Sequence, residues 1–457
     1  MKNNSVETFR SSPGRITALI IPVLLGLAGC LESAKLATIA GIGPNPTLPL
    51  PNRTLIPTVD IAPAEGWPSG AMPTPAPGFT VTRFAGGLDY PRWLYVLPNG
   101  DVLVAETNGP GKSGVTGLKG AVMKQVMKRA GAGVPSANRI TLLRDADGDG
   151  VAETSSVFLQ DLSSPFGMAL VGDTLYVANA DALVKVPYRA GDIAIAAVPE
   201  EVIELPGRGR FNHHWTKSLL ASRDDSRLYV GVGSNSNAAD NGMAVEVDRA
   251  AILEIDPAAR TKRVFASGLR NPVGIAWHPL TGALWTVVNE RDELGSDLVP
   301  DYLTSVREGG FYGWPYSYYG PHVDQEVQPQ QPDLVARAIV PDYALGSHVA
   351  PLGLTFYDAS LLAPRYRGGA FVGMHGSWNR RPPSGYKVVF VPFSNGRPAG
   401  APEDVLTGFV GEDGHAFGRP VGVVVDKTGA LLVADDVGNV VWRVVPVSTR
   451  EDAGDSR

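Results

Sequence analysis

The stretch "NPVGIAWHPLTGALWTVVNE", residues 271–290, contains the structural unit that this chain repeats. A short apolar segment leads into a polar turn, and a second apolar segment follows the turn. Apolar runs of this length around a glycine-containing turn predict a β-hairpin. One such hairpin cannot bury both of its faces, so the pattern predicts further copies packed against it.

Six versions of this phrase occur, at intervals of roughly 50 to 80 residues. They begin at Tyr90, Ser164, His213, Asn271, Ala350 and Arg419. Radial stacking of four-stranded sheets of this kind produces a β-propeller. The sequence therefore predicts an all-β fold, a six-bladed β-propeller. The segment 439–447, "NVVWRVVPV", is expected to pair with 79–86, "FTVTRFAG", and so remove the open edges of the ring.

Composition agrees with this fold class and narrows the choice of partners. The 457 residues include 53 glycines and 38 prolines, and 19% are charged, which suits many short strands joined by tight turns. The formal net charge is −6, without a long run of like charge. A nucleic-acid partner is not predicted, because such proteins carry a clustered basic face.

Residues 1–30 indicate a lipoprotein signal peptide. Basic residues precede the apolar run "ITALIIPVLLGLAG", which ends in "LAGC" at Cys30, the single cysteine of the chain. We expect Cys30 to carry lipid, in an exported, periplasm-facing membrane protein of a bacterium. An ordinary signal peptide with a chance cysteine is the alternative. Without a second thiol no disulfide can form within the chain, so its core must hold the fold.

Residues 31–78 are rich in proline and show no periodicity. This composition favours polyproline II and predicts a semi-rigid tether between the membrane and the globular body. The propeller domain is expected to occupy residues 79–450.

The repeats also predict a ligand site, because the residue before each first strand should lie at the same end of the central channel. Five repeats have a proline there, whereas the third has His213, His214 and Trp215. The equivalent positions hold Arg92, Trp93, Phe166, Arg270, Asn271, His348 and Arg419. Polar groups that converge on one concave mouth are typical of a binding site.

Four phrases carry a resemblance to a known family. They are "PRWLYVLPNGDVLVAET" (91–107), "GLRNPVGIAWHP" (268–279), "GGFYGWP" (309–315) and "GMHGSWNRRPPSGYKV" (373–388). From residue 79 to 447 the chain resembles the quinoprotein sugar dehydrogenases, in particular the sorbosone dehydrogenase-like branch. The resemblance implies a propeller that holds pyrroloquinoline quinone (PQQ) and Ca²⁺ above its channel. It also implies the oxidation of a sugar, or of a related alcohol or aldehyde.

The resemblance assigns roles to residues of the mouth. His214 matches the histidine that takes the hydroxyl proton, a role that contributes about 10²–10⁴-fold to rate. Arg270 and Asn271 match an Arg-Asn pair that contacts the cofactor, and Arg419 matches one of two arginines that bracket the quinone carboxylates. Arg380 falls near a basic cofactor contact of blade five.

Further mouth positions are assigned less directly or depart from the family pattern. His348 is a further candidate contact to the cofactor, His375 is unassigned, and His213 is expected to orient its neighbour. Phe417 stands where the family has its second bracketing arginine.

The expected Ca²⁺ ligands depart from the pattern as well. Asp292 and Glu293 replace a Gly-Pro whose carbonyls help to hold Ca²⁺, so we expect carboxylate ligands there.

Two segments lie outside the repeat. "DADGDGVAE", 145–153, places Asp145, Asp147 and Asp149 like the early ligands of an EF-hand loop, although an acidic β-turn explains them equally well. "GLKGAVMKQVMKRA", 117–130, has helical spacing and predicts an inserted helix that packs on the propeller. Contact with an anionic membrane surface is its alternative.

Three classes of function remain open from the sequence. The first is a PQQ-dependent dehydrogenase with a small sugar substrate and an unnamed electron acceptor. The second is a binding or scaffold propeller without redox chemistry. The third is a Ca²⁺-dependent lactone hydrolase, which Glu106, Asn179 and Glu290 could serve. The arginines favour the first, because several positive charges suit a tricarboxylated quinone.

Overall fold

The computed structural model of the chain describes residues 32–54, 58–110, 125–209 and 211–447. The expected signal peptide with Cys30, and most of the expected inserted helix, lie outside these residues. Within them, residues 125–129 are helical, as the spacing of 117–130 predicted. No helix of the described part has the length and apolar character of a membrane span.

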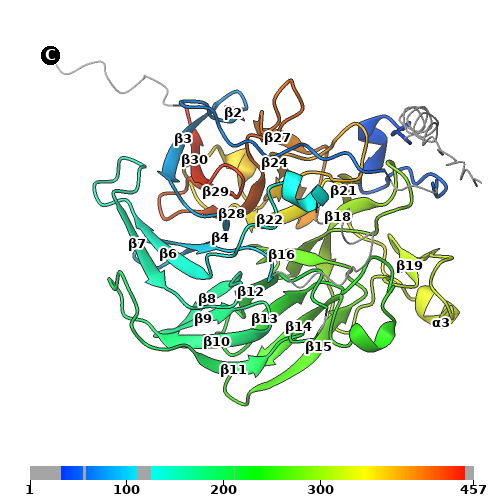
Figure 1. Cartoon of the computed structure of the whole chain (residues 1–457), viewed down its shortest axis with the longest axis horizontal. Helices are drawn as coiled ribbons and strands as arrows, with labels where there is room; N and C mark the ends of the chain where they lie inside the picture. The colour runs from blue at the N-terminus through cyan, green and yellow to red at the C-terminus, as the bar shows by residue number, and fades with distance from the viewer. Residues whose placement is uncertain (1–31, 55–57, 111–124, 210, 448–457) are drawn as a thin grey trace, which may run out of the picture.

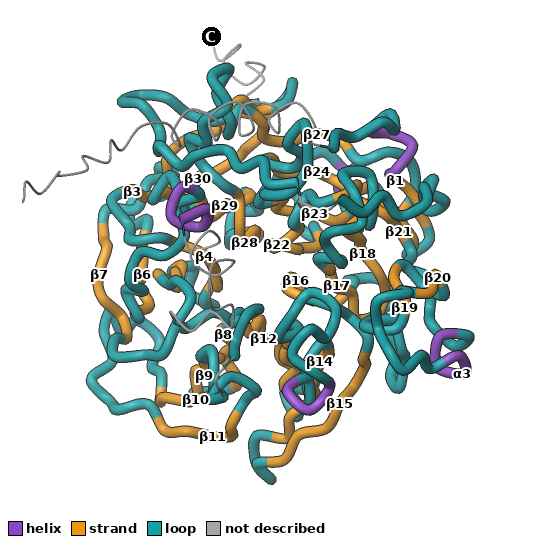
Figure 2. The backbone as a smooth tube through the Cα atoms, turned by 45° about the vertical axis from the view of Figure 1, so that its right-hand side comes forward, coloured by secondary structure: helices purple, strands orange, loops and turns teal. Residues whose placement is uncertain are grey.

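Six antiparallel sheets surround one axis, which confirms the predicted six-bladed propeller (Figures 1 and 2). Blade 1 is β4 (Pro91–Val96), β5 (Val102–Glu106), β6 (Arg139–Arg144) and β7 (Thr154–Leu159). Blade 2 is β8 (Met168–Val171), β9 (Thr174–Ala178), β10 (Ala182–Pro187) and β11 (Glu200–Glu204). Blade 3 is β12 (Lys217–Ala221), β13 (Leu228–Val232), β14 (Ala251–Asp256) and β15 (Thr261–Ser267).

The second half of the ring follows the same order. Blade 4 is β16 (Pro272–Trp277), β17 (Leu284–Val288), β18 (Pro300–Val306) and β21 (Tyr343–Ser347). Blade 5 is β22 (Pro351–Phe356), β23 (Ala370–Met374), β24 (Lys387–Val391) and β27 (Glu403–Thr407). Blade 6 is β28 (Pro420–Val425), β29 (Leu431–Asp435), β30 (Val440–Pro446) and β3 (Phe79–Gly86). The connections add α3 (Pro332–Val335), the 3₁₀ turns η2 (Met243–Val245) and η3 (Pro364–Tyr366), and the short strands β19 (Ser317–Tyr318), β20 (His322–Val323), β25 (Phe393–Ser394) and β26 (Arg397–Pro398).

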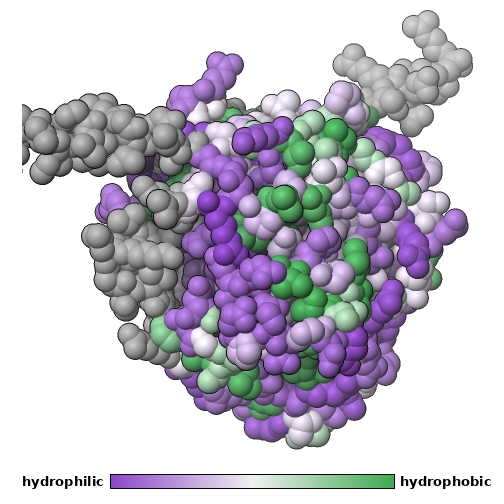
Figure 3. Space-filling model, turned by 90° about the vertical axis from the view of Figure 1, so that its right-hand side faces the viewer, coloured by the Kyte–Doolittle hydropathy of each residue, from purple (hydrophilic) through white to green (hydrophobic). Residues whose placement is uncertain are grey.

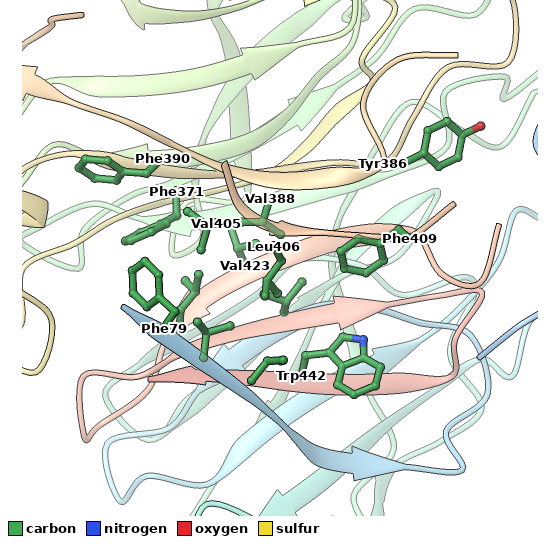
Figure 4. Close-up of a cluster of buried hydrophobic side chains, with 14 of the residues drawn as sticks. Phe79, Phe371, Tyr386, Val388, Phe390, Val405, Leu406, Phe409, Val423 and Trp442 are labelled. Atoms are coloured by element: carbon green, nitrogen blue, oxygen red, sulfur yellow. The ribbon is translucent and has the colours of Figure 1, made fainter. Parts of the chain in front are cut away.

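The ring closes where β3 pairs with β30, as the sequence predicted. The ladder runs from Phe79 opposite Pro446 to Gly86 opposite Val440. Phe79 and Trp442 then pack with Phe371 and Phe390 of blade 5 in a buried cluster (Figure 4). The first and last strands of the domain thus complete a single blade, in which β3 is the outermost strand.

Glycines let the inner strands of neighbouring blades approach backbone to backbone. A Cβ on Gly353 of β22 would lie 2.2 Å from the carbonyl oxygen of Val421 in β28, closer than any real contact. A Cβ on Gly422 of β28 would lie 2.8 Å from the carbonyl oxygen of Arg92 in β4. Cβ atoms on Gly167 and Gly274 would collide in the same way with the inner strand of the next blade. The ring of inner strands is narrow because these positions carry no side chain.

Apolar side chains from all six blades plug the channel. The cluster consists of Trp93, Phe166, Trp215, Val273, Leu352 and Val421, one from each blade. The rings of Trp93 and Phe166 lie 4.6 Å apart, and Phe166 meets Trp215 edge to face at 5.9 Å. Each of these residues lies at or next to the start of an inner strand. The plug therefore forms the floor beneath the residues that precede these strands.

The structure corrects the prediction that residues 31–78 form a tether. Residues 32–54 and 58–78, here called the N-terminal strap, pack along the propeller instead of extending from it. Within the strap, η1 (Thr38–Gly41) leads into β1 (Ile42–Gly43), which adds a fifth strand to blade 4, and β2 (Thr74–Pro75) adds one to blade 5. Trp67 donates from its indole N–H to Asp435 at 2.7 Å. Extended, proline-rich backbone keeps its remaining N–H and C=O groups available, and blade edges and loops supply their partners.

Gly353→Ala should destabilise the propeller by about 1–3 kcal/mol or more, because the new methyl group collides with backbone that cannot move alone. Denaturant unfolding measures the change. Gly209→Ala is the matched control, since a Cβ there meets no atom within 4 Å. Equal stability of the two variants would show that the inner strands do not approach as closely as described.

Candidate functional site

The mouth of the channel lies above the plug and collects residues from all six blades. Most of the positions that the sequence singled out precede an inner strand, and the structure brings them to this one end. The cation of Arg92 in blade 1 lies 5.8 Å from the ring of Trp215 in blade 3. Side chains from blades that are not neighbours in the ring thus approach one another at the mouth.

His214 is held in one orientation by Ser234. Its Nδ1 lies 2.9 Å from the Ser234 carbonyl oxygen and 3.0 Å from the Ser234 hydroxyl. That hydroxyl donates to the Ser236 carbonyl, so both groups accept and Nδ1 carries the proton. Nε2 is then the unprotonated nitrogen and the one able to take a proton. His213 packs edge to face on the ring at 4.7 Å.

Burial lowers the pKa of His214 well below its usual value, and the charges of Arg270 and Arg249 lower it further. Desolvation of the half-buried ring is the main cause of this shift. His214 is therefore a neutral imidazole at pH 7.

Arg270 is fully engaged by protein groups. Its guanidinium donates to Asp292 at 2.8 Å, to the side chain of Asn237 at 3.0 Å and to the carbonyl of Glu290. Burial opposes ionisation of Asp292, yet Arg270 and His348 hold the pKa of this carboxyl below its usual value. Asp292 is thus the internal counter-ion of Arg270.

His348 joins the same group. Its Nε2 donates to the Gly295 carbonyl at 2.9 Å, and its Nδ1 lies 3.6 Å from Asp292. Burial acts to lower the pKa of His348, but the hydrogen bond and charge of Asp292 raise it above its usual value. Asn379 donates to the same carboxylate oxygen of Asp292 at 2.8 Å. Blades 4 and 5 are tied together at this carboxylate.

A second charged group joins blades 1, 5 and 6. Asp436 accepts from Arg92 at 2.6 Å and from His375 at 2.9 Å. Burial raises the pKa of Asp436, but His375 and Arg92 outweigh it and keep the carboxyl ionised. Arg419 lies over the ring of Tyr386 at 5.2 Å and donates to the carbonyl of Ala62 in the strap. Arg92 and Arg419 thus lie in the same half of the mouth, and Asp436 is the carboxylate that Arg92 contacts.

Buried polar atoms without a hydrogen-bond partner gather at the mouth. Among the described residues, five such atoms belong here: Arg92 Nε, Asn271 Oδ1, Asn379 Oδ1, Arg419 Nε and Asp436 Oδ1. Buried donors and acceptors are nearly always paired in native structures, so each exception needs a cause. A bound ligand with both donors and acceptors is one that fits.

Comparison with known proteins agrees with the fold. A family model described as TrAA12-like matches residues 73–302 and 324–446. The chain belongs to this family. The wider family is that of the PQQ-dependent sugar dehydrogenases, to which the chain is distantly related.

Two relatives indicate how distant the relationship is. The PQQ-dependent pyranose dehydrogenase of Coprinopsis cinerea is 26% identical over 439 residues, which cover 82% of this chain and 54% of the relative. The chain therefore spans about half the length of that enzyme. An uncharacterised protein of Borreliella burgdorferi is 28% identical over 292 residues, 62% of this chain and 76% of its own.

Solved structures share the fold. The family AA12 carbohydrate-active enzyme of Trichoderma reesei superposes with a TM-score of 0.66 at 20% identity, covering 85% of this chain and 99% of that one. The PQQ domain of the Coprinopsis cinerea pyranose dehydrogenase gives 0.64 at 23% identity, covering 82% and 97%. Both similarities support the six-bladed architecture and no finer statement.

Some predicted contacts of this TrAA12-like protein are placed elsewhere. Arg380 donates to the carbonyl of Pro382 at 2.7 Å and faces Asp297 at 3.8 Å, apart from the arginines of blades 1 and 6. Phe417 packs against Trp67 of the strap at 5.7 Å.

The predicted metal ligands do not assemble at the mouth. Asp292 is bound by Arg270 and Asn379, and among the described residues it forms no cluster of three carboxylate or imidazole ligands with Glu293. Carboxylate ligation of Ca²⁺ by this pair is therefore not supported.

The acidic loop between β6 and β7 is compact. The ligand atoms of Asp145, Asp147, Asp149 and Glu153 all lie within 4.8 Å of one another. Asp145 accepts from the N–H groups of Gly148 and Gly150, which is the pattern of an acidic turn. The loop closes the outer edge of blade 1, away from the mouth, so it takes no part in the site.

The residues considered for lactone hydrolysis have structural partners. Glu106 accepts from Arg139 and Thr141, and Asn179 accepts from the Ser163 N–H at 3.3 Å. Burial raises the pKa of Glu290 to about 7. The three side chains do not point to a common ion, and the hydrolase alternative loses its support.

Sequence reasoning missed Asp436, Arg249 and Lys217. Asp436 follows the second strand of its repeat, where two other repeats place Thr107 and Ala180, so local comparison gave no signal. Lys217 follows "HHWT" and donates to the Trp215 carbonyl at 3.0 Å. Burial lowers the pKa of Lys217 far below its usual value.

We expect the His214 ring to stay neutral at pH 6.5, where an ordinary histidine is half protonated. Imidazole ¹⁵N shifts over pH 4.5–8, assigned with His214→Gln, measure this. The unfolded chain binds this proton more tightly than the folded chain does. His214 therefore lowers the free energy of unfolding as the pH falls below 6.5. Half-protonation of the folded ring at pH 6.5 or above would contradict the described burial.

Proposed function

We propose that this protein oxidises a sugar, or a related alcohol or aldehyde, with PQQ bound at the mouth. The observation that carries the proposal is the set of five unpartnered buried atoms on the mouth residues. Two of them are arginine Nε donors, and guanidinium groups pair well with carboxylates such as those of PQQ. The names of the relatives agree, since one is a PQQ-dependent pyranose dehydrogenase.

The described residues fit such a cofactor in charge and shape. Arg92 and Arg419 would hold its carboxylates, and Asn271 offers an unpartnered amide oxygen. The aromatic plug of Trp93, Phe166 and Trp215 provides an apolar floor for a planar ring system. When bound, the quinone accepts the hydride from the substrate carbon.

His214 supplies the base. Ser234 fixes its Nδ1–H, so Nε2 takes the proton from the substrate hydroxyl. The neutral state of the ring at pH 7 leaves it ready for that role. Arg249 donates to the His214 carbonyl at 2.9 Å and holds the backbone of the base in place.

The support for Ca²⁺ in this proposal comes only from relatives in the family. A solved relative from Trichoderma reesei is described as a calcium structure. The side chains described at the mouth of this chain do not offer three donors for the ion, so no step of the reaction is assigned to it.

We also propose that the protein is exported and anchored by lipid on Cys30. Glu32, two residues later, accepts from the Ser296 N–H at 2.9 Å, beside blade 4. Extended chain spans at most about 3.5 Å per residue, so lipid on Cys30 would lie within roughly 7 Å of this point. The strap then holds the propeller against the membrane and does not space it away.

His214→Ala should retain fold and quinone affinity while turnover falls about 10²-fold or more, because only the proton acceptor is lost. Dye reduction by the quinone-reconstituted protein over a panel of pyranoses and sorbosone measures the change. His213→Ala is the matched control and should cost much less. Parental turnover in both variants would remove His214 from the mechanism.

Mass spectrometry of the mature N-terminus tests the anchor. We expect a chain that begins at Cys30 with attached acyl groups, and Cys30→Ser should release the protein from membranes. An unmodified chain cleaved elsewhere would contradict this proposal and leave the dehydrogenase proposal intact.

A further inference from the structure

A hollow of about 400 Å³ lies beside the mouth, formed by segments that follow β13, β17 and β18. Its size falls within the range of small-molecule sites, roughly 300–1,000 Å³. We propose that this hollow holds a neutral sugar ring of the substrate and excludes anionic sugars. The inference rests on the proposed function and adds to it the substrate class and the residues that select it.

Hydrogen bonds fix the walls of the hollow to the site. Asn237 accepts from the backbone of Asp292 at 2.9 Å and from Arg270 at 3.0 Å, and its carbonyl accepts from the Trp314 indole at 2.9 Å. Each of the three wall segments begins one or two residues after Asn237, Asp292 or Trp314. The hollow therefore has a set position relative to Arg270, and through it to the base.

The hollow also borders the histidine pair. The N–H of His213 donates to the side chain of Asn235 at 3.3 Å, in the loop that continues into the wall at Ala238. A molecule in the hollow thus lies next to the loop that carries Ser234, the partner of His214.

Tyr316 and two apolar neighbours suit one face of a pyranose. Tyr316 is half-buried and lines the hollow with Met243 and Pro329. A pyranose presents C–H groups on one face, and an aromatic ring covers such a face while its hydroxyl stays available for hydrogen bonding. The surrounding surface, on the side that bears β19 and α3, is mainly hydrophilic with small apolar patches (Figure 3).

The charged lining selects against anions. Asp240, Glu293 and Glu326 line the hollow together with the amide of Gln328. Arg53 and Arg291 form salt bridges with Glu326 and compensate its charge, so the selection against anions rests mainly on Asp240. Carboxylates accept hydrogen bonds from sugar hydroxyls and repel carboxylate or phosphate groups. These three carboxylates form no cluster tight enough for an ion, so a hydroxyl-rich ligand suits the lining better than a metal.

The family match omits residues 303–323 and resumes at residue 324, so it includes Glu326 and Gln328 of the wall and leaves out Tyr316.

Saturation-transfer NMR with D-glucose and D-glucuronate tests the inference on the full chain, with and without added PQQ. We expect glucose to bind at least about 10-fold more tightly than glucuronate, a difference of about 1.4 kcal/mol. Tyr316→Ala should weaken glucose binding fivefold or more, and Asp240→Asn should raise glucuronate affinity severalfold. Asp173→Asn, in the exposed β8–β9 turn, is the matched control and should change neither.

Quinone absorbance titrated in the same samples separates the two proposals. Tyr316→Ala should bind PQQ like the parent, because Tyr316 lies outside the arginine group. Three results would overturn the hollow as the sugar site, even if dye reduction succeeds. Glucose does not bind with or without PQQ, its binding is unaffected by Tyr316→Ala, or it binds no more tightly than glucuronate. Glucose binding at Tyr316 in a protein that takes no quinone would uphold the hollow and overturn the dehydrogenase proposal.

Discussion

Backbone contact between neighbouring inner strands is the constraint on which the rest of this structure depends. Gly353 against the Val421 carbonyl, and Gly422 against the Arg92 carbonyl, set how narrow the ring can be. A narrow ring lets six apolar side chains fill the channel as one plug. It also brings the residues that precede these strands close enough for Arg92 of blade 1 to reach Trp215 of blade 3. The site is a consequence of this packing.

The charges at the mouth divide into two groups with different roles. In blades 3 to 5, Arg270 and His348 both face Asp292. Their interactions with this carboxylate hold the loops and the base in place more than they attract a ligand. In blades 1, 5 and 6, Arg92 pairs with Asp436, Arg419 lies over the ring of Tyr386, and each arginine keeps an unpartnered Nε. An anionic cofactor would gain most from the second group. The neutral His214 lies in the first group, where the arginines help to keep it unprotonated.

Much of this architecture could be predicted from the sequence because it repeats locally. The recurring hairpin phrase gave six blades, and the pairing of β3 with β30 followed from their matching apolar patterns. His214 was identifiable because it replaces a proline that the other repeats share. The capture of Arg270 by Asp292 could not be predicted, because it depends on how the loop after β17 folds back.

The strap escaped prediction for a related reason. Its proline-rich sequence has no periodicity, and its position depends on edge pairing with β21 and β27 and on single contacts such as Trp67 with Asp435. Composition alone predicts a tether for such a segment, because it indicates the local backbone conformation and not the surface on which the segment packs. The carbonyl of Ala62 on Arg419 makes the strap part of the mouth.

Equilibrium titration of the purified full chain with PQQ, followed by absorbance, tests most directly whether the mouth is a cofactor site. The described charges predict saturable binding that weakens at least about 10-fold in Arg419→Met, where one cation and its unpartnered donor are lost. Arg223→Met, in the exposed β12–β13 turn, should bind like the parent. Absence of saturable binding, or equal affinity in Arg419→Met and the parent, would contradict the assignment of the mouth to the quinone.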